Sequence, residues 1–268
     1  MPEGPSIAIL RDQCQMFVGQ RARVVGGNSR VIDIQRMDGK KVVAIRSWGK
    51  HFLVQFPDFF LRVHFLLFGS YRINERRQAA PRLSLGFDNG ELNLYACSVK
   101  YVEGGIEETY DWSTDVLSPR WDPAAANDKL LALPQMLVCD ALLDQSIFSG
   151  VGNIIKNEAL FRIHMHPLSK IGALPTDQLH ELIREARDYS FDFLKWKRAF
   201  VLKKHWQVHN QKTCPRCGIP LIRAHLGKHH RRTFYCESCQ VLWDGPEQPP
   251  QLAQAAVGKK RKTAPRMA

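Results

Sequence analysis

The first segment of the chain has apolar residues at helical spacing. One face of residues 5–18 is apolar. Its members are Ile7, Leu10, Cys14 and Phe17. Because apolar residues three to four positions apart line one side of a helix, this segment is predicted to be an amphipathic helix. Gly19 follows the last of them, and a glycine at this place is a typical helix end.

After this segment, apolar residues occupy every second position, which is typical of strands. Short runs of this kind lie at residues 41–45, 52–56 and 61–65. Apolar residues also alternate through residues 83–94, on either side of the turn Asp88-Asn89-Gly90, and this arrangement predicts a β-hairpin. Residues 2–115 are therefore expected to form a two-layer β-sandwich with one leading helix.

The pattern becomes helical again in the second half of the chain. Residues 111–134 are rich in Asp, Pro, Ser and Ala, and we interpret residues 116–133 as a linker. From 134 to 210 the spacing is helical, and the tight turn Gly150-Val151-Gly152-Asn153 separates two helices. A later helix has an apolar face formed by Leu179, Leu182, Ile183 and Ala186.

Four of the seven cysteines form the pattern C-x2-C-x18-C-x2-C. They are Cys214, Cys217, Cys236 and Cys239. Each C-x2-C pair directs two thiolates at one point, and two pairs complete a tetrahedron around Zn²⁺. Residues 211–243 are therefore predicted to be a zinc finger with one structural zinc ion, and four unrelated thiols are the alternative. The remaining three cysteines, Cys14, Cys97 and Cys139, are expected to be buried apolar residues.

Basic residues lie between the two cysteine pairs and again near the C-terminus. The first group is Arg223, His225, Lys228, His229, His230, Arg231 and Arg232. On a hairpin held by a metal, such residues are suited to binding phosphates, although a solvated hairpin tip has the same composition. Residues 244–268 are rich in Pro, Gln and Ala and are predicted to be a disordered basic tail. Its basic run at 259–262 either attracts phosphates or is merely solvated.

Composition and charge narrow the class of protein. The formal net charge is +12 and the pI is about 9.5. A chain this basic is expected to have a polyanionic partner, nucleic acid before an anionic membrane, or else none. The sequence has no run of about 18 apolar residues, which argues against a membrane-spanning helix. The N-terminal residues lack the basic and apolar parts of a secretory signal, so the expected location is the cytoplasm.

Four sequence motifs occur in order along the chain. They are Met1-Pro2-Glu3-Gly4-Pro5, Gly49-Lys50, Gly150-Val151-Gly152-Asn153 and the four-cysteine module. With this ordered set, the sequence resembles the formamidopyrimidine-DNA glycosylase/endonuclease VIII family over residues 2–240. The resemblance implies an α+β multidomain fold: an N-terminal β-sandwich, a helix-two-turn-helix domain at residues 134–210 and a C-terminal zinc finger. It also implies that double-stranded damaged DNA runs between the two halves. We further expect a monomer that is associated with the nucleoid in the cytoplasm, with no membrane partner and no small-molecule cofactor.

The same resemblance implies a bifunctional DNA glycosylase/AP lyase of base excision repair. Pro2, freed by removal of Met1, is similar to the nucleophile that forms a Schiff base and leads to β,δ-elimination. An α-amine is also more often unprotonated at neutral pH than the amine of a lysine. Glu3 matches the family's proton-transferring carboxylate, or else is an acidic residue favoured at a helix start. Lys50 matches a phosphate-binding lysine, or else is a surface lysine of a strand.

Further positions match residues that contact DNA in this family. Asn153 and nearby backbone N–H groups are expected to bind a phosphate, with a simple helix N-cap as the alternative. Arg231 matches the family's zinc-finger arginine, and Arg232 is its rival. His64 and Leu67 lie in one apolar loop, in which Leu67 matches the residue that fills the void left by a flipped base. A buried strand end is the alternative for this loop.

The sequence departs from the family pattern at three places. Ser6 stands where the family usually has a second glutamate. Residues 95–101 lack the Arg and Phe of the purine-specific branch, and residues 199–213 are shorter than that branch's lesion-capping loop. These differences favour the endonuclease VIII branch and oxidised pyrimidines as substrates. The alternatives are the same chemistry on oxidised purines (8-oxoguanine, formamidopyrimidine), a noncatalytic protein that binds damaged DNA, and an RNA-binding zinc-ribbon protein.

Overall fold

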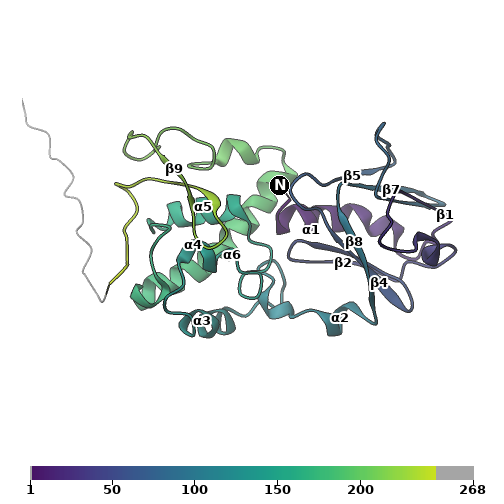
Figure 1. The fold of residues 1–268 in the computed structure, drawn as a ribbon, viewed down its shortest axis with the longest axis horizontal. Helices are drawn as coiled ribbons and strands as arrows, with labels where there is room; N and C mark the ends of the chain where they lie inside the picture. Colours follow the sequence, from purple (N-terminus) through teal and green to yellow (C-terminus); the bar gives the residue numbers. More distant parts are fainter. Residues whose placement is uncertain (1, 246–268) are drawn as a thin grey trace, which may run out of the picture.

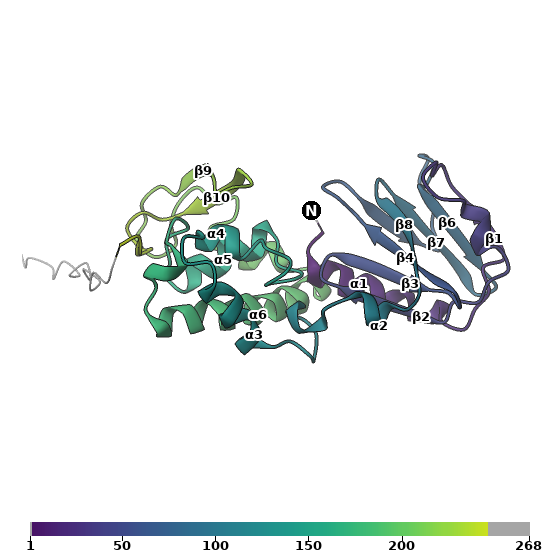
Figure 2. The same ribbon diagram turned by 60° about the horizontal axis from the view of Figure 1, so that its bottom comes forward.

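The computed structural model describes residues 2–245 of the chain. The strands β1–β8 and helix α1 occupy one lobe, the longer helices and the β9–β10 hairpin form the other, and the N-terminus lies between them (Figure 1, Figure 2). Met1, whose removal is predicted, lies outside the described residues. So does nearly all of the predicted disordered tail, including its basic run at 259–262.

The first lobe is a β-sandwich, as predicted. One antiparallel sheet has the order β2-β3-β4-β8 and the other has the order β1-β6-β7-β5. The strands of the first sheet are β2 (Ala44–Trp48), β3 (His51–Gln55), β4 (Phe59–His64) and β8 (Ser98–Glu103). Those of the second are β1 (Val24–Gly26), β5 (Ser70–Ile73), β6 (Leu83–Phe87) and β7 (Gly90–Tyr95). Apolar side chains from both sheets form one core, which includes Val54 and Leu61 from the first sheet and Leu85 and Leu92 from the second.

Helix α1 (Gly4–Gln13) packs against β2 and β3 of the sandwich. It continues into a tighter 3-10 turn at Cys14–Phe17. The predicted helix at residues 5–18 is therefore confirmed, except that its last turn is 3-10. Its apolar face is buried in the sandwich core, as its spacing predicted. Because α1 starts directly after Pro2 and Glu3, its packing fixes where these two residues lie.

Each predicted strand segment corresponds to a strand of the structure, although the boundaries differ, whereas β1, β5 and β8 are not among the predicted segments. The predicted hairpin is confirmed as β6 and β7, which pair across a two-residue turn. The strand predicted at residues 41–45 corresponds to β2, which begins three residues later, at Ala44. Val42 is fully buried, but its backbone bonds to Gly19 and Gln20 and not to a neighbouring strand. The apolar alternation therefore starts before the strand does.

The second lobe is built on α5 (Asn153–Arg162) and α6 (Thr176–Arg198), which pack against each other. The short helix α4 (Val138–Ala141) precedes α5 in the same core. The predicted apolar face of α6 is confirmed, since all four of its members are buried. Helix α5 is buried along nearly its whole length, so its polar side chains need partners inside the protein.

The segment predicted to be a linker, residues 116–133, is part of the second lobe. It contains α3 (Pro123–Leu131), whose inner face is buried in the helical core. The side chain of Asp122 accepts hydrogen bonds from two N–H groups of the first turn, and Pro123 is the first helical residue. The interpretation as a linker is therefore wrong, because an Asp-Pro pair before an alanine run is a helix start.

The C-terminal module at residues 211–243 contains an antiparallel hairpin between its two cysteine pairs. The hairpin consists of β9 (Ile222–Leu226) and β10 (Arg231–Tyr235). Phe161 at the end of α5 packs with Val208 and Phe234, which attaches the module to the second lobe. The short helix α2 (Ile106–Thr109) leads from β8 towards that lobe. Within residues 2–245, every helix is too short or too polar to cross a membrane.

Candidate active site

Three distant parts of the chain meet at the start of α1. The backbone N–H of Gly4 donates to the carbonyl of Gly150, 2.9 Å away. Gly49 approaches the same turn so closely that a Cβ atom there would lie 2.0 Å from Ser149 Oγ. The φ of Gly49 is +51°, which also favours glycine. The N-terminal motif, the Gly49-Lys50 pair and the turn before α5 are thus brought together.

Glu3 is fully buried beneath this junction, and its carboxylate binds the N-terminus of α5. Its Oε1 accepts a hydrogen bond from the N–H of Ile154 at 2.8 Å, and its Oε2 accepts one from Ile155 at 3.3 Å. A Cβ atom at Gly152 would lie 2.3 Å from Glu3 Cδ, so only glycine leaves room for the carboxylate. The side chain of Glu3 makes no cap bond to α1. Glu3 is the N-cap residue of α1, but its carboxylate forms its hydrogen bonds with the start of α5, where a negative charge is also favoured.

The protonation of Glu3 and Lys50 is set by burial and by their neighbours. Burial raises the pKa of Glu3, while Lys50 and the two backbone hydrogen bonds act in the opposite direction. Burial lowers the pKa of Lys50, with Glu3 raising it and Arg231 lowering it further. Glu3 therefore holds a proton more readily than a surface glutamate, and Lys50 loses one more readily than a surface lysine. Such shifts are common where protons are transferred.

A cavity of about 770 Å³ opens next to Pro2. Its wall includes five residues that the sequence singled out, namely Pro2, Lys50, His64, Leu67 and Arg231. Arg232 is not on this wall, since successive side chains of β10 point to opposite faces of the hairpin. Of the two rival arginines, Arg231 is thus the one that faces the cavity.

Asn153 is not among the residues that line this cavity. It is the first residue of α5 and the residue before it is the N-cap, so the alternative of an Asn N-cap is wrong. Its side chain is 6% exposed, and its amide donates to the carbonyl of Arg232 at 2.7 Å. Two backbone N–H groups near it, those of Ile154 and Ile155, donate to Glu3. At these two groups a carboxylate of the protein takes the place that the sequence predicted for a phosphate.

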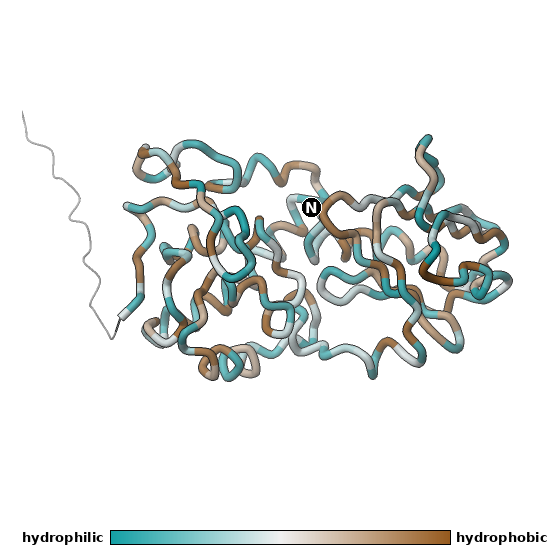
Figure 3. Tube along the Cα trace, viewed as in Figure 1, coloured by the Kyte–Doolittle hydropathy of each residue, from teal (hydrophilic) through white to brown (hydrophobic). Residues whose placement is uncertain are grey.

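The loop after β4 exposes large apolar side chains. Leu66, Leu67 and Phe68 are 53%, 51% and 87% exposed. Figure 3 shows this hydrophobic stretch beside the N-terminus. Leu66 has a φ of +51°, a conformation that costs a non-glycine residue about 1–3 kcal/mol and is found often at functional sites. Phe65 is buried, so the alternative of a buried strand end holds for that residue only.

Pro2 also lines a second cavity, of about 580 Å³. Polar residues of α1 and β5 contribute to its wall, among them Ser6, Tyr71 and Arg72. The Tyr71 hydroxyl donates to Gln13 Oε1 at 2.8 Å, which fixes both side chains. Leu67 and Phe68 line this cavity as well as the first. Pro2 and the exposed loop therefore stand where the two cavities meet.

Two polar residues, one of them buried, position the junction but carry no signal in the sequence. The carboxylate of Asp115 accepts hydrogen bonds from the N–H groups of Gly49 and Leu117, at 3.0 and 2.9 Å. Gln145 Oε1 accepts a hydrogen bond from the N–H of Gly150 at 3.1 Å. Neither residue belongs to a spaced motif, so their role is visible only once the backbone is folded.

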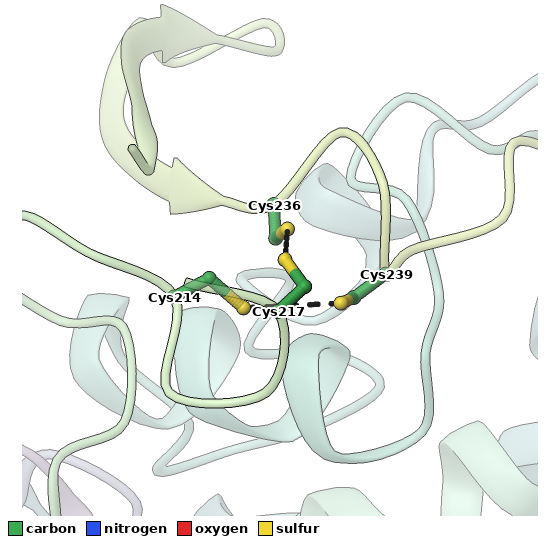
Figure 4. Close-up of side chains that lie close together, drawn as sticks. All are labelled: Cys214, Cys217, Cys236 and Cys239. Carbon is green, nitrogen blue, oxygen red and sulfur yellow. Dashed lines mark hydrogen bonds between the residues drawn. The ribbon is translucent and has the colours of Figure 1, made fainter. Parts of the chain in front are cut away.

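The four cysteines of the C-terminal module converge (Figure 4). Their Sγ atoms all lie within 4.8 Å of one another. The Sγ atoms of Cys214 and Cys239 are 3.8 Å apart, and those of Cys217 and Cys236 are 3.5 Å apart. Four sulfurs at about 2.3 Å from a tetrahedral metal would be about 3.8 Å apart, so the cluster could hold a metal ion. The alternative of four unrelated thiols is wrong, and the other three cysteines are buried as expected.

The chain matches two models of one protein family. Residues 1–97 match the formamidopyrimidine-DNA glycosylase N-terminal domain. Residues 114–189 match the formamidopyrimidine-DNA glycosylase H2TH domain. The two matches fall on the sandwich lobe and on the helical lobe.

Curated relatives are endonuclease 8-like proteins. The chain is 30% identical to Endonuclease 8-like 3 of Xenopus laevis over 227 residues, which are 78% of this chain and 36% of that protein. It is 36% identical to Endonuclease 8-like 2 of Bos taurus over 211 residues, which are 70% of this chain and 61% of that protein. The chain therefore spans from about a third to three-fifths of the length of these relatives.

Solved structures of the same fold include DNA glycosylases. Formamido-pyrimidine DNA glycosylase of Lactococcus lactis, non-covalently bound to DNA containing an AP site, superposes with a TM-score of 0.78 at 20% identity, over 89% of this chain and 99% of that one. A viral DNA glycosylase superposes with a TM-score of 0.77 at 20% identity, over 89% and 100% of the two chains. These likenesses confirm the predicted fold class.

Proposed function

Because the chain belongs to the formamidopyrimidine-DNA glycosylase/endonuclease VIII family, on its endonuclease VIII-like side, we propose that it is a bifunctional DNA glycosylase/AP lyase of base excision repair. One observation carries the proposal. Pro2 stands on a cavity wall together with Lys50 and Arg231, and the carboxylate of Glu3 is buried beside it. Cleavage at a deoxyribose needs an amine, a group that carries protons and cations that bind the phosphates.

The first step joins Pro2 to the sugar. Its amine becomes available when Met1 is removed, which a small second residue permits. The nitrogen attacks C1′ of the damaged nucleotide, and the glycosidic bond breaks with its electron pair leaving on the base, which takes up a proton. The amine then loses its proton, the C1′–O4′ bond opens, and O4′ is protonated. Glu3, adjacent in the chain and held by α5, is the carboxylate that carries these protons.

The second step cuts the strand. The iminium ion formed from a secondary amine has no N–H to lose, so it stays cationic and withdraws electrons from C2′. Loss of the C2′ proton expels the 3′ phosphate by β-elimination. Loss of a further proton, from C4′, expels the 5′ phosphate by δ-elimination and leaves a gap of one nucleoside. Lys50 and Arg231 face the cavity in which these phosphates would lie, and their cations stabilise the leaving groups.

On this proposal, the two cavities bind different parts of the substrate, one the DNA backbone and the other the damaged base. The cavity with Lys50 and Arg231 takes the sugar and phosphates of double-stranded damaged DNA, and the cavity beside Ser6 takes the base that is turned out of the helix. Leu67 would enter the space that this base leaves. Oxidised pyrimidines remain the predicted substrates, with oxidised purines as the alternative. The monomeric state and the cytoplasmic, nucleoid-associated location also remain predictions.

We infer that the cysteine cluster binds one structural Zn²⁺. Cys214, Cys217, Cys236 and Cys239 supply four thiolates at the spacing of a tetrahedron, and such a set leaves no ligand position for water. When bound, the ion joins the two ends of the hairpin module. The protein's own residues then do the chemistry, and the module contributes Arg231 to the cavity.

Trapping with borohydride tests the proposed function, because the reagent reduces the iminium ion to a stable bond. The wild-type protein should form a covalent adduct with an abasic duplex. In a matched variant, extra residues that cannot be removed precede Pro2. This variant should still bind a duplex with a tetrahydrofuran site but should give no adduct. Ser6, which replaces the usual glutamate, is the observation that favours a noncatalytic DNA-binding protein. Absence of an adduct from the wild type, or an equal adduct from the blocked form, would support that second candidate.

A further inference from the structure

Lys156 is a lysine inside the protein. It lies in the middle of α5, its side chain is 1% exposed, and it is among the largest fully buried side chains. Its Nζ donates to the hydroxyl of Thr233 at 2.7 Å. Among the ion pairs of residues 2–245, none includes Lys156. A buried ammonium is costly unless it is paired, so its presence calls for a functional reason.

The side of α5 that carries Lys156 faces the zinc-finger hairpin. Asn153 lies three residues before Lys156 and four before Asn157, so its side chain neighbours both of theirs on the helix surface. The amide of Asn153 donates to the carbonyl of Arg232 at 2.7 Å, and that of Asn157 reaches the same carbonyl at 3.5 Å. These contacts attach strand β10 to α5.

Lys156 is linked to Arg231 through one intermediate. Thr233, which is 1% exposed, accepts a hydrogen bond from Lys156 and donates one to the backbone carbonyl of Arg231 at 3.0 Å. Arg231 and Thr233 are two residues apart on β10, so their side chains share one face of the hairpin. The chain of bonds therefore runs from α5 to the backbone of the arginine that lines the cavity.

We propose that Lys156 is a positioning residue, whose buried ammonium holds Arg231 at the DNA phosphates through Thr233. This proposal rests on the proposed function in one respect, namely that Arg231 binds DNA phosphates. Because the lysine is buried, it does not touch the DNA itself. Helix α5 then serves both halves of the site: its N-terminus holds Glu3, and its side holds the hairpin.

The charges around Lys156 agree with this role. Burial lowers the pKa of Lys156 to about 8, with the cation of Arg231 acting in the same direction and Cys139, Asp140 and Glu3 in the opposite one. His209 is a further neighbour, and Lys156 helps to lower its pKa. A neutral side chain of similar length would avoid the cost of burial. Lys156→Met should therefore leave the free energy of unfolding unchanged or raise it. If Lys156 had a merely structural role, the same substitution would lower it.

A double-mutant cycle on DNA binding tests the proposal. The probe is a duplex with a tetrahydrofuran site, which can be bound but not processed, so its result is independent of the lyase chemistry. Lys156→Met should weaken binding about tenfold at pH 7, and Lys156→Arg should weaken it less. Because Lys156 acts through Arg231, the variant with both Lys156→Met and Arg231→Gln should bind no more weakly than Arg231→Gln alone. Losses that multiply would overturn the proposal, as would unchanged binding by Lys156→Met.

A control and a second measurement separate this proposal from the proposed function. Lys129→Met removes one lysine from α3, which lies away from the hairpin, and should leave binding unchanged (Figure 2). Hydrogen exchange needs no DNA. In Lys156→Met, the amides of β9 and β10 should exchange faster while the melting temperature and the metal content stay at wild-type values. If the hairpin amides exchange at the wild-type rate, Lys156 does not position the hairpin, whatever the protein binds.

Discussion

Single residues at the site are constrained by space as much as by chemistry. Gly152 has a φ of −120°, which alanine could adopt without strain. Its constraint comes instead from Glu3, whose Cδ would lie 2.3 Å from an added Cβ atom. The glycine of this turn is thus required by the position of the carboxylate and not by its backbone angles.

Gly152→Ala is accordingly expected to displace Glu3 from the two N–H groups of α5 and to lower the free energy of unfolding by about 1–3 kcal/mol. Urea unfolding measures the loss of stability, and the borohydride adduct measures the loss of activity. Gly26→Ala is the matched control, because no atom lies within 4 Å of the Cβ it would add. A Gly152→Ala protein with wild-type stability and activity would show that the carboxylate is not held as tightly as we describe.

The sequence could identify site residues only where they belong to a spaced motif. Pro2, Lys50 and the cysteines were found in this way, and the structure places Pro2 and Lys50 on one wall. Composition fits Arg231 and Arg232 equally, and the match to the family pattern favoured Arg231, which is the one that lines the cavity. Asp115 and Lys156 were missed because each is a single polar residue whose burial depends on distant parts of the chain.

Elements were predicted well where their apolar period was uniform. The face of α6 and the β6–β7 hairpin follow directly from spacing and turn residues. Helix α3 was missed because its Asp, Pro and Ala content is also typical of a linker, and only its N-cap distinguishes the two. The start of β2 was misplaced because Val42 is buried without joining the sheet.

The exposed apolar loop after β4 is expected to act as a wedge in duplex DNA. Leu67→Ala should lower the rate of excision from a damaged duplex about tenfold and leave excision from a single strand unchanged, because only a duplex has a void to fill. Single-turnover assays on the same lesion in both contexts measure the two rates. Leu131→Ala removes a leucine of similar exposure from the end of α3 and serves as the control. Equal losses on both substrates would argue against a wedge.

At the scale of the whole molecule, the site exists because two lobes meet at the N-terminus. Gly4 bonds to Gly150, and Gly49 packs on Ser149, so each lobe supplies part of the wall around Pro2. The order of motifs in the sequence predicted that these segments share one function. It could not predict their distances, because those depend on how α1 and α5 pack within their separate cores.

The arrangement leaves two amines in one cavity, those of Pro2 and Lys50, and burial makes Lys50 easier to deprotonate than an ordinary lysine. Both could form a bond to a sugar, so the presence of an adduct does not by itself identify the nucleophile. The bond is expected on Pro2, because its secondary amine gives an iminium ion that stays cationic through the elimination steps.

Peptide mapping of the borohydride-trapped adduct by mass spectrometry tests this claim most directly. The reduced deoxyribose is expected on the N-terminal peptide, which begins at Pro2 and lacks Met1. An adduct on the peptide that contains Lys50, or on a protein that keeps Met1, would contradict it.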